Sequence, residues 1–411
     1  MKVAIVDADI VGRNKHRFPN LACMKLSSYY KAQGHSVELV TDYNLLTFFG
    51  MPEFDKVFIS KVFTDTPIED WVLELPNVEY GGTGFFYDKA PPLPEEVEHS
   101  MPDYHLYDKW VEKCIENGAS EKEFTYYKDY SIGFLTRGCF RQCEFCVNRN
   151  YKRCVTHSNI KEFYDETRPK LCFLDDNFFA NPKWCDIIQE VKAIGKPFQF
   201  KQGLDERLLT DKHIHEMLTW KYDSDFIFAF DNIEDRPLVE KKLQRIFELY
   251  PDWKKSLKFY VFCGFDRQDK WDREFWVEDV KNIFERAFVL AKYSALPYIM
   301  RFERAYTSDF AGLYTAIASW CNQPQFFKKM TFKQYAIARG MSNELYKVYK
   351  GNHEQFVADG HKKGSSWRYM EEFEQSYPEI ANKYFNTAGD MLLEYGNGKK
   401  IEYKEESDNG D

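Results

Sequence analysis

The sequence lacks any apolar segment long enough to cross a membrane. Nowhere in its 411 residues is there a run approaching the roughly 18–20 consecutive apolar residues that a bilayer span needs. The first ten residues, MKVAIVDADI, are interrupted by Asp7 and Asp9 and contain no apolar core of the kind a secretory signal carries. We therefore expect a cytoplasmic protein with no membrane partner.

Cations are in the minority. The chain has 56 Lys and Arg against 65 Asp and Glu, a net charge of −9, which argues against a function based on nonspecific attraction to phosphates. Hydrophobic residues make up 44% of the chain and aromatic residues 18%. This much apolar material excludes a disordered chain and predicts large folded cores.

Cysteine is unevenly spread. Three of the ten cysteines, Cys139, Cys143 and Cys146, form a C-x3-C-x2-C cluster, and a disulfide scaffold would not crowd three thiols in this way. A loop with this spacing can instead wrap three thiolates around one soft metal centre. The other seven stand alone and are expected to be buried packing residues in a reducing compartment. They are Cys23, Cys114, Cys154, Cys172, Cys185, Cys263 and Cys321.

A closed zinc site is the alternative interpretation of the same cluster. Cys154 follows eight residues after Cys146, and His157 is close to it, so four ligands are within reach along the chain. Structural zinc sites usually pair two short Cys-x2-Cys knuckles, and this sequence has only one. The three-cysteine interpretation is therefore preferred.

Residues 1–95 predict a Rossmann-like α/β domain, in which strands alternate with helical segments. Its expected strands are residues 2–6, 37–40, 55–60 and 77–80, with a helix over 21–33. Prolines at 91, 92 and 94 break the pattern, and residues 96–130 are predicted to be a linker.

Residues 131–305 repeat the alternation six times and predict a parallel sheet curled into a partial (β/α)6 barrel. Residues 306–411 show helical patterning without strands, and 404–411 read as an acidic tail. The expected barrel strands are 132–135, 171–174, 198–200, 225–230, 259–262 and 298–300, and helices are expected at 184–194, 211–218, 237–249 and 274–291.

Polar residues follow almost every predicted barrel strand. Because the carboxyl ends of barrel strands form the active-site face, these side chains should meet at one mouth, beside the cysteine loop that follows the first strand. This agreement predicts an enzyme, and the mixed charges predict a polar substrate. The residues are Thr136, Arg137, Asp175, Asp176, Asn177, Lys201, Gln202, Asp205, Glu206, Arg207, Asp231, Asn232, Asp266, Arg267, Arg301, Glu303 and Arg304.

At these residues the chain resembles the radical S-adenosylmethionine (SAM) superfamily. The signature of that family is C-x3-C-x-aromatic-C after the first strand of a partial barrel, and Cys139, Cys143, Phe145 and Cys146 match it. The resemblance implies a 4Fe-4S cluster whose open iron is chelated by SAM. One electron from a donor would cleave SAM to a 5′-deoxyadenosyl radical, which would abstract hydrogen from a substrate that the sequence does not identify. The organic chemistry would belong to the cofactors.

The resemblance also implies roles for further residues. Phe145 would pack near the adenine of SAM. The family commonly binds the SAM amino group through Gly-Gly-Glu at the end of the second strand. This chain has Asp175, Asp176 and Asn177 there, and which Asp takes that role is open. The resemblance places a ribose contact at Asp231 and Asn232 and a SAM carboxylate contact at Arg301.

The amino-terminal domain resembles the cobalamin-binding domain of one subgroup of this family. Residues 18–21 and 34–39 resemble its opening, and residues 173–178 resemble that subgroup's second barrel strand. No Asp-x-His-x-x-Gly motif is present, but members can lack it, so cobalamin binding and cobalamin-dependent methyl transfer remain an open alternative. Methylthiotransferases of the family carry a second three-cysteine cluster in this domain, and the single Cys23 within residues 1–110 argues against that class.

An alternative from another class is a noncatalytic, metal-stabilised module that binds nucleic acid. Residues 324–340, PQFFKKMTFKQYAIARG, mix aromatic and basic side chains that could stack on bases and neutralise phosphates. Such a segment is more often an amphipathic helix with lysines on its wet side, and the net charge of −9 opposes the nucleic-acid interpretation.

Overall fold

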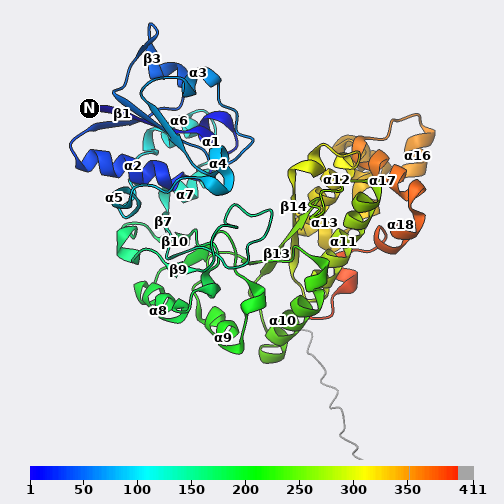
Figure 1. Ribbon diagram of the computed structural model, residues 1–411. Helices are drawn as coiled ribbons and strands as arrows, with labels where there is room; N and C mark the ends of the chain where they lie inside the picture. The colour runs from blue at the N-terminus through cyan, green and yellow to red at the C-terminus, as the bar shows by residue number, and fades with distance from the viewer. Residues whose placement is uncertain (351, 397–411) are drawn as a thin grey trace, which may run out of the picture. The chain divides into compact units, whose positions relative to one another are not determined.

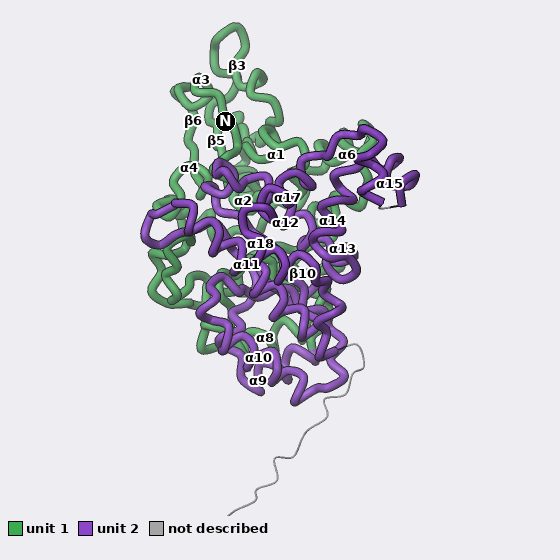
Figure 2. The backbone as a smooth tube through the Cα atoms, turned by 90° about the vertical axis from the view of Figure 1, so that its right-hand side faces the viewer, with its two compact units in different colours: residues 1–202, 220–223 green, residues 203–219, 224–411 purple. Residues whose placement is uncertain are grey.

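The structure is a computed structural model that describes residues 1–350 and 352–396. The chain divides into two compact units, residues 1–202 with 220–223 and residues 203–219 with 224–411 (Figure 2). It is a mixed α/β protein with several parallel sheets, as the sequence predicts. Within the described residues, every helix is too short or too polar for a membrane span.

A four-stranded parallel sheet that contains β1 opens the first unit (Figure 1). Its strand order is β2-β1-β5-β6. The four strands predicted within residues 1–95 are confirmed to within a residue or two. Their bounds are β1 (Lys2–Asp7), β2 (Ser36–Leu39), β5 (Lys56–Ser60) and β6 (Val78–Gly81). β1 is buried along nearly its whole length, which accounts for the apolar residues at positions 3–6. Helix α2 (Leu21–Ala32) begins at Asn20, whose side chain accepts hydrogen bonds from the backbone of Ala22 and Cys23.

Residues 96–130, predicted to be a linker, contain helices that add to the core of this sheet. Tyr107, Val111 and Phe124 are buried in the same cluster as Val3 and Ile5 of β1. The prolines that end the strand alternation therefore mark a change of element, and the chain continues to pack on the same sheet. The helices are α5 (Glu95–Glu98), α6 (Asp108–Glu116) and α7 (Thr125–Lys128).

A buried polar network lies where β1 and β5 end. The Tyr107 hydroxyl donates to the Asp7 carboxylate at 2.8 Å and accepts from the backbone N–H of Asn20 at 3.1 Å. The side-chain amide of Asn20 donates to the Ser60 hydroxyl at 2.9 Å. Burial raises the pKa of Asp7 from its ordinary 3.8 to about 7, although the bond from Tyr107 opposes this rise.

Asp7 predicts a pH dependence of folding. The folded chain retains a proton on Asp7 that the unfolded chain releases near pH 3.8. The stability from this group is therefore present below that pH and is lost as the pH rises through about 7. Between pH 5 and pH 8 we expect the urea-unfolding free energy of the parent to fall by roughly 2 kcal/mol more than that of Asp7→Asn. Equal falls in the two proteins would contradict this account.

All six strands predicted within residues 131–305 are confirmed, three in each unit. In the first unit the parallel order is β11-β10-β7, and in the second it is β12-β13-β14. The strands are β7 (Tyr130–Gly133), β10 (Lys170–Phe173), β11 (Phe198–Phe200), β12 (Phe226–Ala229), β13 (Leu257–Cys263) and β14 (Leu296–Arg301).

The four predicted intervening helices are also confirmed. Their amphipathic patterns are clear because each buries one face, as Ile187, Ile188 and Val191 do in the first of them. They are α8 (Trp184–Ile194), α9 (Asp211–Thr219), α10 (Arg236–Leu249) and α11 (Arg273–Lys292).

The region after residue 305 is helical in its described part, as predicted, and the expected acidic tail at 404–411 lies outside the described residues. Residues 324–340 form two short helices, in which Phe327, Phe332 and Tyr335 are buried. These rings pack in the core and are not exposed for stacking on bases. The helices are α12 (Ala311–Cys321), α13 (Pro324–Lys329), α14 (Phe332–Arg339), α15 (Asn343–Tyr349), α16 (His353–Ala358), α17 (Ser365–Ser376) and α18 (Pro378–Tyr384).

Candidate functional site

The cysteine loop is held at its base by a short hairpin. Strand β8 (Thr136–Arg137) pairs antiparallel with β9 (Val155–Thr156), so the chain leaves and returns at the same place. Gly138 stands at the start of the loop with a φ of +95°. A Cβ there would lie 2.4 Å from the Arg153 carbonyl oxygen, so this close crossing requires glycine.

Hydrogen-bond donors point at the sulfurs of two loop cysteines. The backbone N–H of Arg141 donates to Cys139 Sγ at 3.4 Å, and that of Asn148 donates to Cys146 Sγ at 3.4 Å. The side-chain amide of Asn177 donates to Cys139 Sγ at 3.3 Å. Donors of this kind favour a thiolate over a thiol and orient the sulfur of a metal ligand.

The three loop cysteines are half-buried, and a backbone hydrogen bond joins two of them. The backbone N–H of Cys146 donates to the Cys143 carbonyl at 2.9 Å, which forms a tight turn between them. Burial raises the pKa of Cys146, the donor from Asn148 lowers it, and the charges of Cys143 and Cys139 raise it. Within residues 1–350 and 352–396, no three His, Cys, Asp or Glu side chains are gathered as a metal shell.

The two carboxylates of the Asp-Asp-Asn sequence after β10 bind different parts of the chain: Asp175 binds the residues that follow β7, and Asp176 binds the cysteine loop. Asp175 is fully buried and accepts from the backbone N–H groups of Leu135 and Thr136 at 3.1 and 2.6 Å, and from the Thr136 hydroxyl at 2.6 Å. Burial raises the pKa of Asp175 to about 7, against these hydrogen bonds. Both carboxylate oxygens are thus engaged in holding the chain that leads into the cysteine loop.

Asp176 is less buried than Asp175 and holds the loop at two points. Its carboxylate accepts from the Gly138 N–H at 2.6 Å and from the Asn148 side chain at 2.7 Å. Burial raises the pKa of Asp176, and the positive charge of Arg137 opposes the rise. The cysteine loop and the Asp-Asp-Asn sequence are about 35 residues apart in the chain, and the structure brings them into direct contact.

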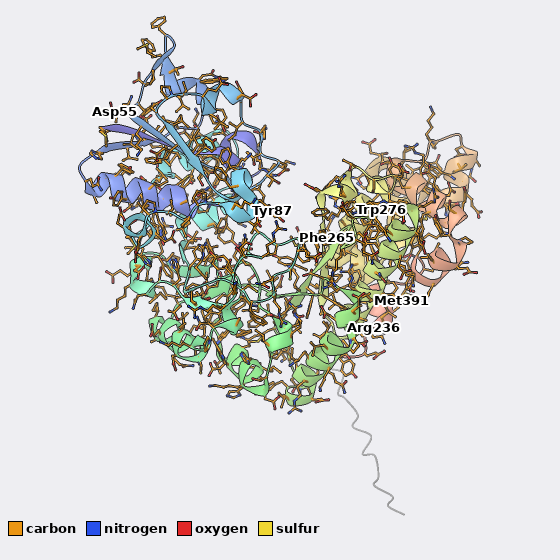
Figure 3. All side chains as sticks on the ribbon, viewed as in Figure 1. Asp55, Tyr87, Arg236, Phe265, Trp276 and Met391 are labelled. Carbon is orange, nitrogen blue, oxygen red and sulfur yellow. The ribbon has the colours of Figure 1, made fainter. Side chains whose placement is uncertain are left out.

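The loop is also fastened to the segment that follows β6. The Tyr87 hydroxyl donates to the Phe145 carbonyl at 2.5 Å, and Arg149 pairs with Asp88 at 2.6 Å. Tyr87, marked in Figure 3, has a positive φ of 51°, a strained conformation for a residue with a side chain. Sequence reasoning missed both anchors, and the turn glycines just before them were the only local signal.

Removal of the Tyr87 hydroxyl should loosen the cysteine loop. In Tyr87→Phe the Phe145 carbonyl loses the hydrogen bond from this hydroxyl while the ring remains. Any iron reconstituted onto the loop should therefore be released to a chelator about three- to tenfold faster. Tyr80→Phe is the matched control, because Tyr80 is exposed and only its ring contacts Phe85 and Phe86. Identical release rates in the two variants would argue against the anchoring role.

Cys154 and His157, the additional ligands of the alternative zinc site, contact other groups of the protein. Cys154 is buried, and burial raises its pKa to about 11. The His157 ring contacts the Ser158 hydroxyl at 2.9 Å and the Glu98 carboxylate at 3.5 Å. Neither side chain belongs to a metal-binding group within the described residues.

A second polar cluster lies in the other unit, at the carboxyl ends of β12 and β13. Asp231 accepts from the Phe262 N–H at 3.2 Å, and Asn232 accepts from Arg267 at 2.9 Å. Burial raises the pKa of Asp231, while Arg286 lowers it. Together with Asp266, these residues line a cavity of about 250 Å³. This cluster brings Asp231 and Asn232 together as predicted.

Arg286 holds the two strand ends of this cavity in place. It is almost fully buried, and one guanidinium nitrogen donates to the carbonyls of Phe230, Asp231 and Phe262 at 2.8–2.9 Å. No pattern in the sequence marks this arginine, because it stands in the middle of an amphipathic helix, α11.

Two of the remaining predicted residues belong beside Asp231: Glu206 accepts from the Ala229 N–H at 3.3 Å, and the charge of Arg207 lowers the pKa of Asp231. The others have different partners. Arg301 donates to the Thr315 hydroxyl at 2.7 Å and is not part of the cavity that Asp231 lines. Lys201 donates to the Tyr126 hydroxyl at 3.0 Å in the first unit. Glu206 is buried, which raises its pKa to about 8, and neighbouring Arg207 pairs with Asp205 at 2.9 Å.

The seven isolated cysteines agree in large part with the packing role expected of them. Five are buried, and Cys114 and Cys185 are half-buried. No family model, curated protein or solved structure matches the chain. The chemistry is therefore inferred from the cysteine loop, its braces and the polar strand ends.

Proposed function

We propose that the chain is a radical SAM enzyme in which Cys139, Cys143 and Cys146 hold a 4Fe-4S cluster. The observation that carries the proposal is the C-x3-C-x-Phe-C sequence on a loop that directly follows a strand of a parallel sheet. Three thiolates suit a cubane cluster that keeps one iron open. The N–H donors to Cys139 and Cys146 fit such ligands.

The two three-stranded sheets are proposed to be the halves of one partial (β/α)6 barrel. Support comes from the parallel pairing within each sheet and from the helices between successive strands. In such a barrel the polar groups at both sets of carboxyl ends would share one mouth.

When bound, the cluster and SAM would supply reductive cleavage of SAM and hydrogen abstraction from a polar substrate. The protein's own residues would bind and orient these groups. Asn177 would fix the direction of the Cys139 sulfur, and Phe145 would pack on the adenine. Asp176 is the more accessible of the two carboxylates after β10 and suits the SAM amino group, while Asp231 and Asn232 suit the ribose. Arg301 is proposed for the SAM carboxylate.

Anaerobic reconstitution tests the proposal. Protein treated with iron and sulfide without air should bind about four irons per chain and form 5′-deoxyadenosine from SAM when dithionite is added. An electron-donor protein would replace dithionite in a cytoplasmic setting. Bound zinc that survives air, with no 5′-deoxyadenosine, would instead support the noncatalytic metal module, whose binding to RNA or DNA would depend on salt.

Cobalamin-dependent methyl transfer is the second candidate, and the four-stranded parallel sheet of the first unit favours it. Ligands of such sheets bind in the crevice beyond the strand ends, where the strand order reverses. At that point, between β1 and β5, Asn20 already bonds Ser60 and Tyr107 covers Asp7. A retained corrinoid chromophore and formation of S-adenosylhomocysteine would distinguish this enzyme from one that only abstracts hydrogen.

A further inference from the structure

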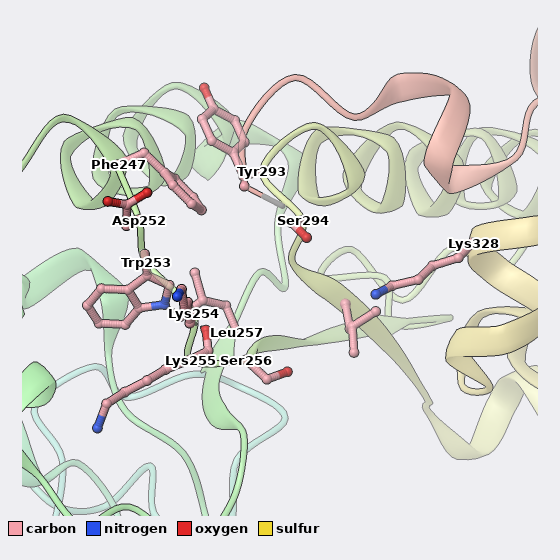
Figure 4. A pocket seen from close by; sticks show the side chains of 12 residues that line it. Phe247, Asp252, Trp253, Lys254, Lys255, Ser256, Leu257, Tyr293, Ser294 and Lys328 are labelled. Carbon is pink, nitrogen blue, oxygen red and sulfur yellow. Dashed lines mark hydrogen bonds between the residues drawn. The ribbon is translucent and has the colours of Figure 1, made fainter. Parts of the chain in front are cut away.

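A cavity of about 350 Å³ lies in the second unit, away from the polar strand ends described above (Figure 4). Its walls come from the turn before β13, the turn before β14, and helix α13. It is therefore at the amino ends of these strands, the end that serves stability in β/α folds and does not carry the active site. A polar cavity at this end needs another explanation.

The charge of the cavity is positive in an otherwise acidic chain. Lys254, Lys255 and Lys328 line it against the single carboxylate of Asp252. Lys255 directs its ammonium over the Phe226 ring at 5.6 Å. In the described part of the chain, neither Lys254 nor Lys328 has an ion-pair or hydrogen-bond partner for its ammonium.

Lys328 is the unusual member of this set because it is half-buried as well as unpaired. Its neighbour Lys329 is exposed and pairs with Asp390 at 3.0 Å. A cation that is partly removed from water without a counter-charge costs free energy, which a bound anion would offset. Figure 4 shows Lys328 reaching from α13 toward Ser294 on the opposite wall.

The aromatic side chains that line the cavity already interact with other groups of the protein. The Trp253 indole donates to the Lys255 carbonyl at 2.6 Å, and the Tyr293 ring stacks on Tyr395 at 4.5 Å. Ser256 forms a side-chain hydrogen bond to Asp225. The groups left to face a ligand are the ammoniums of Lys254 and Lys328 and the hydroxyl of Ser294. Ammonium and hydroxyl donors together suit the several acceptor oxygens of an oxyanion.

We propose that this cavity binds a phosphate group, free or as the ester of a small molecule. Lys328 supplies the principal charge, the hydroxyl of Ser294 donates a hydrogen bond, and Lys254 adds charge at the rim. The site is independent of the proposed radical SAM chemistry, since none of its residues takes part in the metal loop or the polar strand ends.

Calorimetric titration of the full chain at constant ionic strength tests the site. The probes are inorganic phosphate and ribose 5-phosphate, added to the parent, Lys328→Met and Lys329→Met. We expect Lys328→Met to bind phosphate about tenfold more weakly than the parent, and Lys329→Met to bind within about twofold of it. Tighter binding of ribose 5-phosphate would identify an ester as the ligand, and equal binding would identify the free anion.

Two further measurements keep the test decisive if Lys328→Met does not fold. Ser294→Ala should weaken binding severalfold, and phosphate should raise the unfolding temperature of the parent more than that of Ser294→Ala, because a ligand stabilises the form that binds it. The proposal fails if the parent does not bind phosphate at millimolar concentrations. It also fails if Lys328→Met and Lys329→Met bind it equally well.

Discussion

Under the radical SAM proposal, Cys143→Ala should hold no iron–sulfur cluster and should lose SAM cleavage. A cubane that retains two of its three protein thiolates is weakly held, so we expect iron to fall from about four per chain to near background and 5′-deoxyadenosine formation to fall at least 100-fold. The measurement is iron and sulfide content after anaerobic reconstitution, followed by product analysis with dithionite.

The matched control for this variant is Cys185→Ala. Cys185 is half-buried on α8 and is one of the seven isolated cysteines, so its loss should leave iron content and SAM cleavage within about twofold of the parent. If Cys143→Ala cleaved SAM as fast as Cys185→Ala does, the radical SAM proposal would be wrong.

The strands and helices of this chain could be predicted from local pattern alone. β11 and α8 fall on the predicted residues, because an apolar run bounded by turns and an amphipathic helix both carry a strong periodic signal. The arrangement of residues 96–130 could not be predicted in the same way. Tyr107 and Phe124 reach a core that includes Val3 and Ile5, about 100 residues earlier in the chain, and no local pattern reports such a partner.

The sequence marks the residues of the candidate site, but it does not report the contacts that each residue makes in the structure. The spacing of Cys139, Cys143 and Cys146 predicts a metal loop, and strand ends predict Asp175 and Asp176 as neighbours of that loop. Which carboxylate faces solvent depends on how β7 and β10 pair, a register that the sequence does not report. The anchor at Tyr87 comes from a segment that follows a strand of a different sheet, so only the three-dimensional structure reveals it.

Asp175 is the brace on which the geometry of the loop depends, and Asp175→Ala should be strongly destabilising. The change leaves two backbone N–H groups and the Thr136 hydroxyl buried without their acceptor. Each such loss costs roughly 1–3 kcal/mol, so we expect urea unfolding at pH 7 to show a loss of about 3–5 kcal/mol. Iron binding should fall as well, since Thr136 leads directly into the loop.

Asp175→Asn separates the hydrogen-bond role from the role of charge. The amide retains one oxygen that can accept from Thr136 but points an N–H₂ group at the N–H of Leu135, so an intermediate loss of about 2–3 kcal/mol is expected. Asp186→Ala, in the first turn of α8, removes a carboxylate without such bonds and should cost less than about 1 kcal/mol. If Asp175 acts through its hydrogen bonds, the loss of unfolding free energy should be largest in Asp175→Ala, smaller in Asp175→Asn and smallest in Asp186→Ala. If Asp175→Ala were as stable as Asp186→Ala, Asp175 would not hold the loop, and a direct ligand role for Asp175 would become the better explanation.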